Sequence, residues 1–212
     1  MLQIRWHGHS CFEIKDDITL VTDPHDGKSI GIPAPTVEGD IILVSHDHYD
    51  HNSVKTVEKI GSKVVKDERK RKIFNVDIKG IKTYHDEKSG DIRGENIIFK
   101  FLIDDIIFCH LGDLGHMVEE SIVEKIGRVD ILFIPVGGNF TIDADIAWEI
   151  IKSIEPAIII PMHYKIGGLS LPIDNLDTFL EKSVYKILKV GNEIDFDKTD
   201  IPKETEIWTF TL

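Results

Sequence analysis

One stretch decides how this sequence folds and what it holds: His46-Asp47-His48-Tyr49-Asp50-His51. It directly follows the apolar run Ile41–Val44, which is typical of a buried strand. In an extended segment the side chains alternate, so His46 and His48 point to one side and can share one cation. A turn after them would present Asp50 and His51 together. The stretch therefore predicts two adjacent metal positions at a strand end, in preference to a solvated, histidine-rich loop.

The composition favours a small enzyme without a polyanionic partner. A chain of 212 residues can bury a sizeable core, and we expect a single domain over residues 1–212. The formal net charge of −12 argues against binding to nucleic acid or to an anionic membrane. Cys11 and Cys109 lie far apart, so neither a disulfide framework nor a thiolate zinc site is expected. With no leader or membrane-spanning apolar run apparent, these features predict a cytoplasmic protein.

The first half of the chain is rich in short apolar or alternating runs, which predict strands. We expect strands at Leu2–Trp6, Cys11–Ile14, Ile18–Val21, Ile41–Val44, Ser62–Val65, Ile78–Tyr84, Asn96–Ile103 and Ile106–Cys109. Asp104-Asp105 would join the last two as a hairpin. The stretch Ser53–Ile60 is predicted to be a helix, because Val54, Val57 and Ile60 would lie on one face.

From residue 119 onward, predicted helices alternate with predicted strands. The helices are expected at Glu119–Ile126, Asp143–Ile154 and Ile173–Lys182. The strands are expected at Ile131–Ile134, Ile158–Ile160, Tyr185–Val190 and Ile207–Phe210. This order predicts a layered α/β (α+β) fold, in which two mixed β-sheets pack together with helices outside.

Three further residues could complete the metal site. His85 follows the strand ending at Tyr84, Asp113 follows the strand ending at Cys109, and His163 follows the strand at Ile158–Ile160. Loops that follow strands collect at one edge of a sheet fold and often carry functional side chains. A single histidine in such a place is more often a hydrogen-bonded structural residue. The three together, in this order, indicate a full site.

Taken together, these residues resemble the metallo-β-lactamase superfamily, in particular its short metal-dependent hydrolases such as the ascorbate-6-phosphate lactonase-like enzymes. The resemblance covers nearly the whole chain and rests on His46-x-His48-x-Asp50-His51, His85, Gly112-Asp113, His163 within Pro161–Tyr164, Trp6-His7-Gly8-His9-Ser10 and Thr22-Asp23-Pro24. It implies a four-layer αββα sandwich of two mixed sheets, with helices on the outer faces and metals along one edge.

The resemblance also implies a role for each ligand. The first metal would be held by His46, His48 and His85, and the second by Asp50, His51 and His163. Asp113 would bridge the two metals. Because the ligands are rich in nitrogen, zinc is the first expectation for both divalent ions, with manganese, iron or nickel as alternatives.

The expected reaction is hydrolysis by a hydroxide that bridges the two metals, with Asp50 and Asp113 as the catalytic carboxylates. A small-molecule substrate would lose a lactone, ester or phosphodiester bond. One alternative is a nuclease or RNA-processing member of the same superfamily. Such relatives usually carry an inserted arm, for which 212 residues leave no evident room. A second alternative is a non-catalytic metal-binding or sensing protein.

Four more residues are candidates for contacts around the metals or with substrate. Asp23 could accept a hydrogen bond from a metal-bound imidazole, or could cap its own turn before Pro24. His9 could approach the site or be a buried structural residue. His110 lies three residues before Asp113 and could touch substrate. Lys165 could bind an anionic group or be an ordinary solvated lysine.

Overall fold

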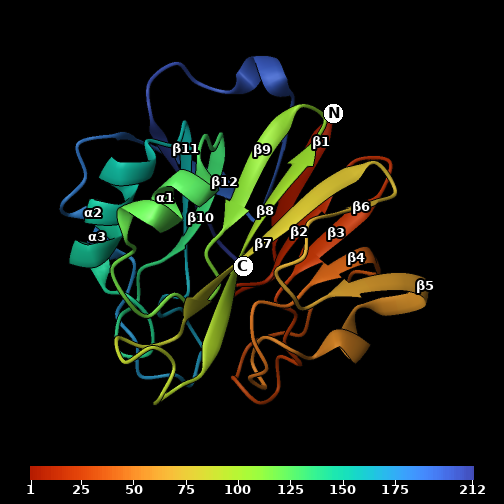
Figure 1. Ribbon diagram of the computed structural model, residues 1–212, viewed down its shortest axis with the longest axis horizontal. Helices are drawn as coiled ribbons and strands as arrows, with labels where there is room; N and C mark the ends of the chain where they lie inside the picture. The colour runs from red at the N-terminus through yellow and green to blue at the C-terminus, as the bar shows by residue number, and fades with distance from the viewer.

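Two β-sheets packed face to face form the centre of the computed structural model, which describes all 212 residues (Figure 1). The strands of the first sheet are β1 (Leu2–Trp6), β2 (Phe12–Lys15), β3 (Thr19–Thr22), β4 (Gly39–Leu43), β5 (Glu58–Val65) and β13 (Glu193–Phe196). Their order in space is β13-β1-β2-β3-β4-β5. Neighbours are antiparallel from β13 to β3 and parallel from β3 to β5, so the sheet is mixed.

The second sheet has eight strands and is also mixed. They are β6 (Arg71–Ile73), β7 (Val76–Tyr84), β8 (Glu95–Ile103), β9 (Ile106–His110), β10 (Ile131–Pro135), β11 (Ile158–Met162), β12 (Lys186–Gly191) and β14 (Glu206–Phe210). Their order is β12-β14-β11-β10-β9-β8-β7-β6, parallel up to β9 and antiparallel beyond it. The hairpin predicted at Asp104-Asp105 is present, with both residues at positive φ as a tight primed turn requires.

Three α-helices cover the outer face of this second sheet, and α1 lies against the antiparallel strands β7 and β8 (Figure 1). They are α1 (Glu120–Ile126), α2 (Ala144–Ile154) and α3 (Asp177–Leu180). Asp143 caps α2 by accepting a hydrogen bond from Ile146 N at 3.0 Å, and Trp148 of α2 stacks on Phe179 of α3. Two 3₁₀ turns, η1 (Val54–Thr56) and η2 (Lys198–Asp200), complete the elements. None of the helices is long and apolar enough to cross a membrane.

The main core lies between the sheets and under the helices, as one cluster of 46 buried residues. Phe12 of β2 meets Phe133 of β10 at 4.6 Å between ring centroids, which joins the two sheets. Every residue of β10 and β11 is buried. These two central strands face the first sheet on one side and helices on the other, which explains why their sequences are continuously apolar. The predicted fold of two packed mixed sheets is thus confirmed.

The helix predicted at Ser53–Ile60 is wrong. Only η1 is helical there, and the chain enters β5 at Glu58, four residues earlier than the predicted strand. Val57 packs on the outer face of the first sheet with Cys11, whereas Ile60 is fully exposed on the edge strand. Of the three residues that suggested one helical face, Val54 lies in η1, Val57 directly follows it, and only Ile60 lies in the extended edge strand. The helical layer expected over this sheet is reduced to a single turn.

The helix predicted at Ile173–Lys182 is shorter than expected, and two strands were not predicted. Ile173 packs into a small separate cluster with Ile30, and Asp174 N donates to Gly137 O at 2.8 Å, so the chain becomes helical only at Asp177. The missed strands, β6 and β13, lie on sheet edges and have three and four residues. Strands this short and polar carry almost no periodic signal.

The two cysteines provide a test of the packed core. Both are buried and unpaired, and burial raises the pKa of Cys109 to about 12 and that of Cys11 well above its ordinary value. Because the thiolate is the reactive form, we expect neither thiol to react with a colorimetric disulfide reagent at about pH 8 in the native protein. Both should react in concentrated guanidinium. Rapid labelling of either cysteine in the native state would contradict this packing.

Candidate metal centre

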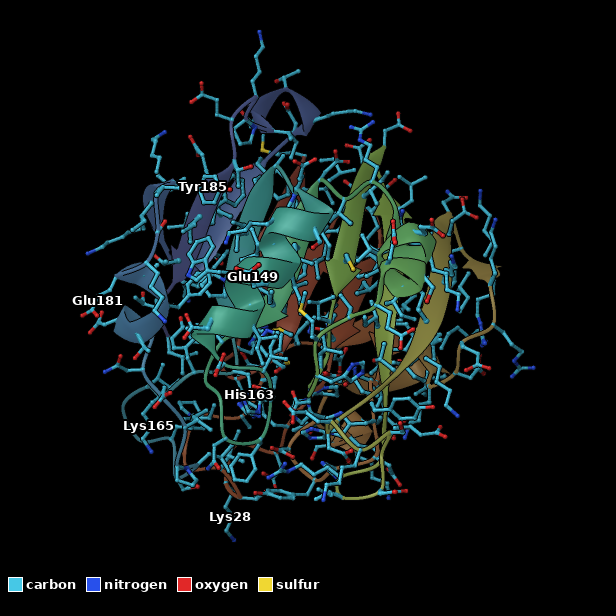
Figure 2. The ribbon with its side chains drawn as sticks, turned by 60° about the vertical axis from the view of Figure 1, so that its left-hand side comes forward. Lys28, Glu149, His163, Lys165, Glu181 and Tyr185 are labelled. Carbon is cyan, nitrogen blue, oxygen red and sulfur yellow. The ribbon has the colours of Figure 1, made fainter.

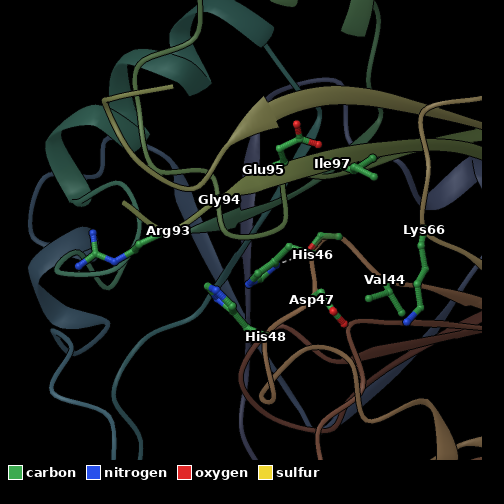
Figure 3. A pocket seen from close by; sticks show the side chains of 10 residues that line it. Val44, His46, Asp47, His48, Lys66, Arg93, Gly94, Glu95 and Ile97 are labelled. Atoms are coloured by element: carbon green, nitrogen blue, oxygen red, sulfur yellow. Dashed lines mark hydrogen bonds between the residues drawn. The ribbon is translucent and has the colours of Figure 1, made fainter. Parts of the chain in front are cut away.

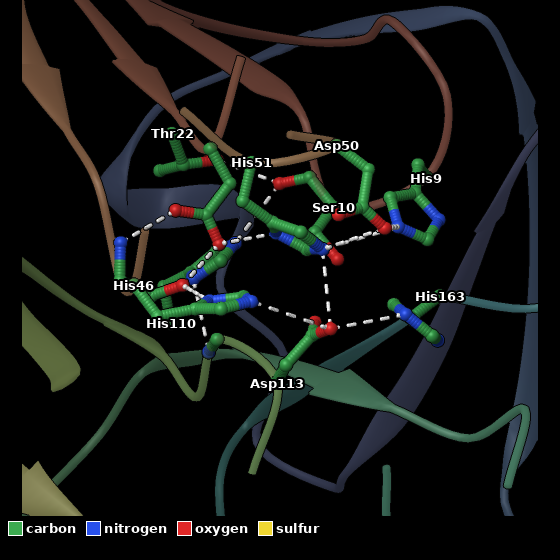
Figure 4. A network of polar contacts seen from close by, with 12 residues as sticks. His9, Ser10, Thr22, His46, Asp50, His51, His110, Asp113 and His163 are labelled. Carbon is green, nitrogen blue, oxygen red and sulfur yellow. Dashed lines mark hydrogen bonds and ion pairs between the residues drawn. The ribbon is translucent and has the colours of Figure 1, made fainter. Parts of the chain in front are cut away.

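Loops from both sheets meet at one edge of the sandwich and bring together all seven residues predicted to bind metal. Figure 4 shows His46, Asp50, His51, Asp113 and His163 of this set. These loops follow β4, β7, β9 and β11. The residues are His46, His48, Asp50 and His51 after β4, His85 after β7, Asp113 after β9 and His163 after β11. Figure 2 shows His163 among the loops at this end of the strands. The predicted convergence of strand ends is therefore present in the structure.

The first group of ligand atoms belongs to His46, His48 and His85, which lie within 4.8 Å of one another. His46 Nδ1 lies 2.9 Å from Ser45 Oγ, and that hydroxyl lies 2.7 Å from Asp23 Oδ2. A carboxylate only accepts, so the hydroxyl donates to Asp23 and accepts from His46 Nδ1–H. This relay leaves the lone pair of His46 on Nε2, which faces the group.

The second group consists of Asp50, His51 and His163, joined by His9, again within 4.8 Å. His51 Nδ1 donates to Asp23 Oδ2 at 3.1 Å, so its Nε2 is also left as the lone-pair nitrogen. His9 Nε2 lies 3.1 Å from His51 Nε2 and 3.2 Å from Asp50 Oδ2. His9 thus lies inside this group.

Asp113 lies between the two groups. Its Oδ2 is 3.1 Å from Nε2 of both His51 and His163, and 3.4 Å from His85 Nε2. The backbone makes this possible at Gly112, whose φ is +59° and where a Cβ would lie only 2.3 Å from Asn96 Oδ1. Asn96 Oδ1 in turn accepts from Asp113 N at 2.9 Å, which fixes the carboxylate facing both groups.

Burial and charge put His9, His46 and Asp113 in the protonation states that metal binding requires, whereas His51 favours its protonated form. Burial lowers the pKa of His9 and of His46 to about 3, so both imidazoles are neutral near pH 7. Burial raises the pKa of Asp113, but His163 and His51 outweigh it and hold the carboxyl ionised. Burial lowers the pKa of His51, but the carboxylates of Asp113 and Asp50 have the larger effect and raise it above its ordinary value. A buried cation would replace that proton, because neutral imidazole and ionised carboxylate are the ligating forms.

The donors themselves fit divalent metal ions. His46 Nε2 and Asp113 Oδ1 are buried atoms without a hydrogen-bond partner. Buried polar atoms are rarely left in that condition unless an ion or water completes them. A set of imidazole nitrogens and carboxylate oxygens suits zinc and its first-row neighbours.

The four outer candidates have different surroundings. Asp23 is buried and accepts from Ser45 N, Ser45 Oγ and His51 Nδ1, so it orients imidazoles in both groups. His110 is occupied structurally: its Nε2 lies 3.0 Å from Ser10 O and its Nδ1 accepts from Gly112 N. It holds the turn before Asp113 and does not line the cavity in front of the metal ligands.

Lys165 does not point into the centre. Its Nζ donates to the backbone carbonyls of Leu169 and Leu171, at 2.8 Å for the latter, and so closes the loop after β11. This loop places Leu171 in the wall of the cavity in front of the metal ligands. The lysine is therefore a positioning residue, not the anion-binding group that was one of its two predicted roles.

A cavity of about 290 Å³ opens onto the two groups. Its lining residues are His48, Tyr49, Asp50, His85, Ile92, Arg93, Asp113, Phe140, His163 and Leu171. Neither Arg93 nor Phe140 was predicted as a site residue, and neither was Ser45 of the histidine relay. Arg93 lies in a loop of mixed charge with no spacing signal. Ser45, however, immediately precedes His46, and a hydroxyl in that place could have been recognised as a hydrogen-bond partner.

Known proteins are similar to this chain in sequence and in fold. A family model described as a β-lactamase superfamily domain matches residues 3–163. A UPF0173 metal-dependent hydrolase from Thermoplasma acidophilum is 30% identical over 189 residues, which cover 77% of this chain and 83% of the relative. Another from Methanocaldococcus jannaschii is 25% identical and covers 95% of this chain and 99% of its own.

A solved structure extends the likeness to three dimensions. A protein from Thermotoga maritima, described as a candidate zinc-dependent hydrolase of the metallo-β-lactamase superfamily, superposes with a TM-score of 0.82 at 34% identity. The match covers 99% of this chain and 98% of the other. The matched family region also contains every residue of the two groups, from His9 to His163. The chain therefore belongs to the metal-dependent hydrolases of the metallo-β-lactamase superfamily.

Proposed function

We propose that the protein holds two divalent metal ions, most simply zinc, and hydrolyses a lactone, ester or phosphodiester bond in a small substrate. The observation that carries this proposal is the position of Asp113, whose Oδ2 lies within 3.4 Å of ring nitrogens from both groups. One carboxylate so placed can serve two ions. We assign His46, His48 and His85 to one ion and Asp50, His51 and His163 to the other, with Asp113 shared.

Bound there, the ions would supply a nucleophile near neutral pH by lowering the pKa of water, and would polarise the bond to be cleaved. The protein supplies the geometry. Asp23 holds His51 directly and His46 through Ser45, so both ligand nitrogens stay aimed at the centre. Asp50 lines the cavity, and its Oδ2 lies 3.2 Å from His9 Nε2, so this carboxylate is placed to hold a proton and pass it to the leaving group.

The cavity supports a small substrate. Its volume, about 290 Å³, is at the lower end of the range of about 300–1,000 Å³ seen for small-molecule sites. Apolar side chains of Ile92, Phe140 and Leu171 form part of its wall. The net charge of −12 would repel the phosphates of an RNA strand, and a cavity of this size is small for one. We therefore favour a metabolite over nucleic acid.

The proposal as a whole is tested by elemental analysis of the purified protein and by assay against a panel of lactones, esters and phosphodiesters. We expect two ions per chain after reconstitution with zinc, and metal-dependent turnover of at least one class. Removal of the ions by a chelator should abolish turnover, and addition of zinc should restore it. Fewer than one ion per chain, or a fully loaded protein inactive on the whole panel, would overturn the proposal.

Asp113→Ala is expected to remove both metal binding and hydrolysis, because the shared carboxylate would be lost from both groups. Metal content should fall by at least one ion per chain, and turnover by more than the roughly 10–100-fold typical of an outer partner. The matched control is Asp195→Asn, because Asp195 is exposed on β13 at the edge of the first sheet; it should change neither metal content nor turnover. Full metal content with retained turnover in Asp113→Ala would remove the bridging role.

Asp23→Asn tests the orienting role separately from ligation. The amide can still accept one bond but loses the charge that holds His51 Nδ1–H, so we expect metal affinity to fall by about 10–100-fold while both ions can still bind at high concentration. Ser45→Ala should have a smaller effect, because it interrupts only the relay to His46. Affinity is measured by competition with a zinc chelator. Equal affinities in all three proteins would show that Asp23 only caps its turn.

A further inference from the structure

An arginine without a carboxylate partner stands in the wall of the metal cavity. Arg93 is half-buried and lines the cavity beside Asp113 and His163. Its guanidinium forms neither an ion pair nor a hydrogen bond, although the other four arginines of the chain are each paired with an acidic side chain. A guanidinium carries a permanent charge and five donors, so an unpaired one in the wall of a ligand cavity can bind an anion.

The loop that carries Arg93 is held rigidly. Asp86, which directly follows His85, accepts backbone hydrogen bonds from Lys88, Gly90, Ile92 and Arg93, at 2.7 to 3.0 Å. Burial opposes ionisation of this carboxyl, but the four amides outweigh it and lower the pKa of Asp86 to about 2. The loop is thus tied to the segment that supplies a metal ligand. Ile92 and Arg93 are presented side by side to the cavity.

The guanidinium is also oriented. Arg93 Cζ lies 5.3 Å from the centroid of the Phe140 ring, so one face of the guanidinium is covered and its in-plane donors remain free. Arg93 also lines an adjoining cavity of about 450 Å³, where its side chain extends away from His46 and His48 (Figure 3). Its position over the Phe140 ring directs it toward the metal cavity, which Phe140, Asp50 and His163 also line.

No other lysine or arginine competes for this role. Lys165 is bound to two backbone carbonyls, and Lys66 lines the adjoining cavity, where its Nζ contacts Asn52 Oδ1. Arg93 is the one lysine or arginine that lines the metal cavity. The remaining wall near it is apolar, from Ile92, Phe140 and Leu171.

We propose that Arg93 binds a carboxylate group of the substrate, so that the enzyme acts on small esters or lactones that carry a free carboxylate at a distance from the cleaved bond. A planar guanidinium with one face covered matches a planar carboxylate through two parallel hydrogen bonds. A phosphate monoester carries more charge and more acceptors, and the cavity offers it no second lysine or arginine. The cleavage of such esters rests on the proposed hydrolase function, whereas the binding of a carboxylate by Arg93 does not.

The kinetic test uses two esters that differ only in charge: mono-4-nitrophenyl glutarate and 4-nitrophenyl pentanoate, with zinc-loaded protein. Arg93→Gln should lower kcat/KM for the glutarate ester by about 30- to 100-fold, the loss expected for hydrogen bonds to a charged group. The pentanoate ester should be hardly affected. Arg93→Lys should recover part of the loss, because lysine keeps the positive charge but lacks the planar pair of guanidinium donors. Lys66→Gln is the matched control and should leave both substrates unchanged.

The binding test is independent of turnover. Calorimetry with butyrate, butyramide and propyl phosphate on the zinc-loaded protein should show that butyrate binds best, and that Arg93→Gln weakens butyrate specifically. Butyrate binding that survives Arg93→Gln would be coordination at the metals and would overturn the inference, as would a preference for propyl phosphate. Arg93-dependent binding without hydrolysis of any ester would instead contradict the proposed function alone. Melting temperatures of all variants check that the fold is kept.

Discussion

The buried carboxylate of Asp23 is the constraint on which the metal centre depends. It lies at the end of β3 and is almost completely buried, where an ionised group without partners would be costly. Ser45 N, Ser45 Oγ and His51 Nδ1 all donate to it. Burial raises the pKa of Asp23, yet His51 more than offsets this and keeps the carboxyl ionised. The charge is stabilised only while the residues after β4 stay in place, so the need to satisfy Asp23 determines where the two imidazoles point.

This dependence explains why the centre lies at the strand ends and not within a sheet. Ladder hydrogen bonds occupy the backbone of β3 and β4, and the first free amide after β4 that reaches Asp23 is that of Ser45. Beyond the strands the chain adopts conformations that strands forbid, and His9, Asp23 and His163 all have positive φ. Such backbone is tolerated where surrounding contacts over-determine it, and it turns each side chain back toward the centre.

The sequence predicted the features that rest on local pattern or on ligand spacing. The buried strands β10 and β11 and the helix α2 were recognised because their apolar periodicity reflects burial directly. His46 and His48 do share one group, as predicted from strand alternation, although they lie in the loop beyond the end of β4. The helix at Ser53–Ile60 failed because the helical turn ends at Thr56 and the chain then pairs with β4 from Glu58 onward, which the local spacing of Val54, Val57 and Ile60 does not encode. Arg93 escaped prediction for a different reason. Its importance comes from the position of Phe140, 47 residues away in sequence, and from the lack of a partner, which no local pattern contains.

Asp86 repeats on the substrate side what Asp23 does on the metal side. Each is a buried carboxylate just beyond a strand, and each is stabilised by several donors from the segment it organises. The two systems meet at the segment that begins with His85, since this candidate ligand directly precedes Asp86 and therefore the loop that carries Arg93. Placement of the metal and placement of the substrate are for this reason not independent in the fold. A shift of the His85 backbone would move the guanidinium as well, so the distance between the reacting centre and the anion-binding group is set by one short stretch of chain.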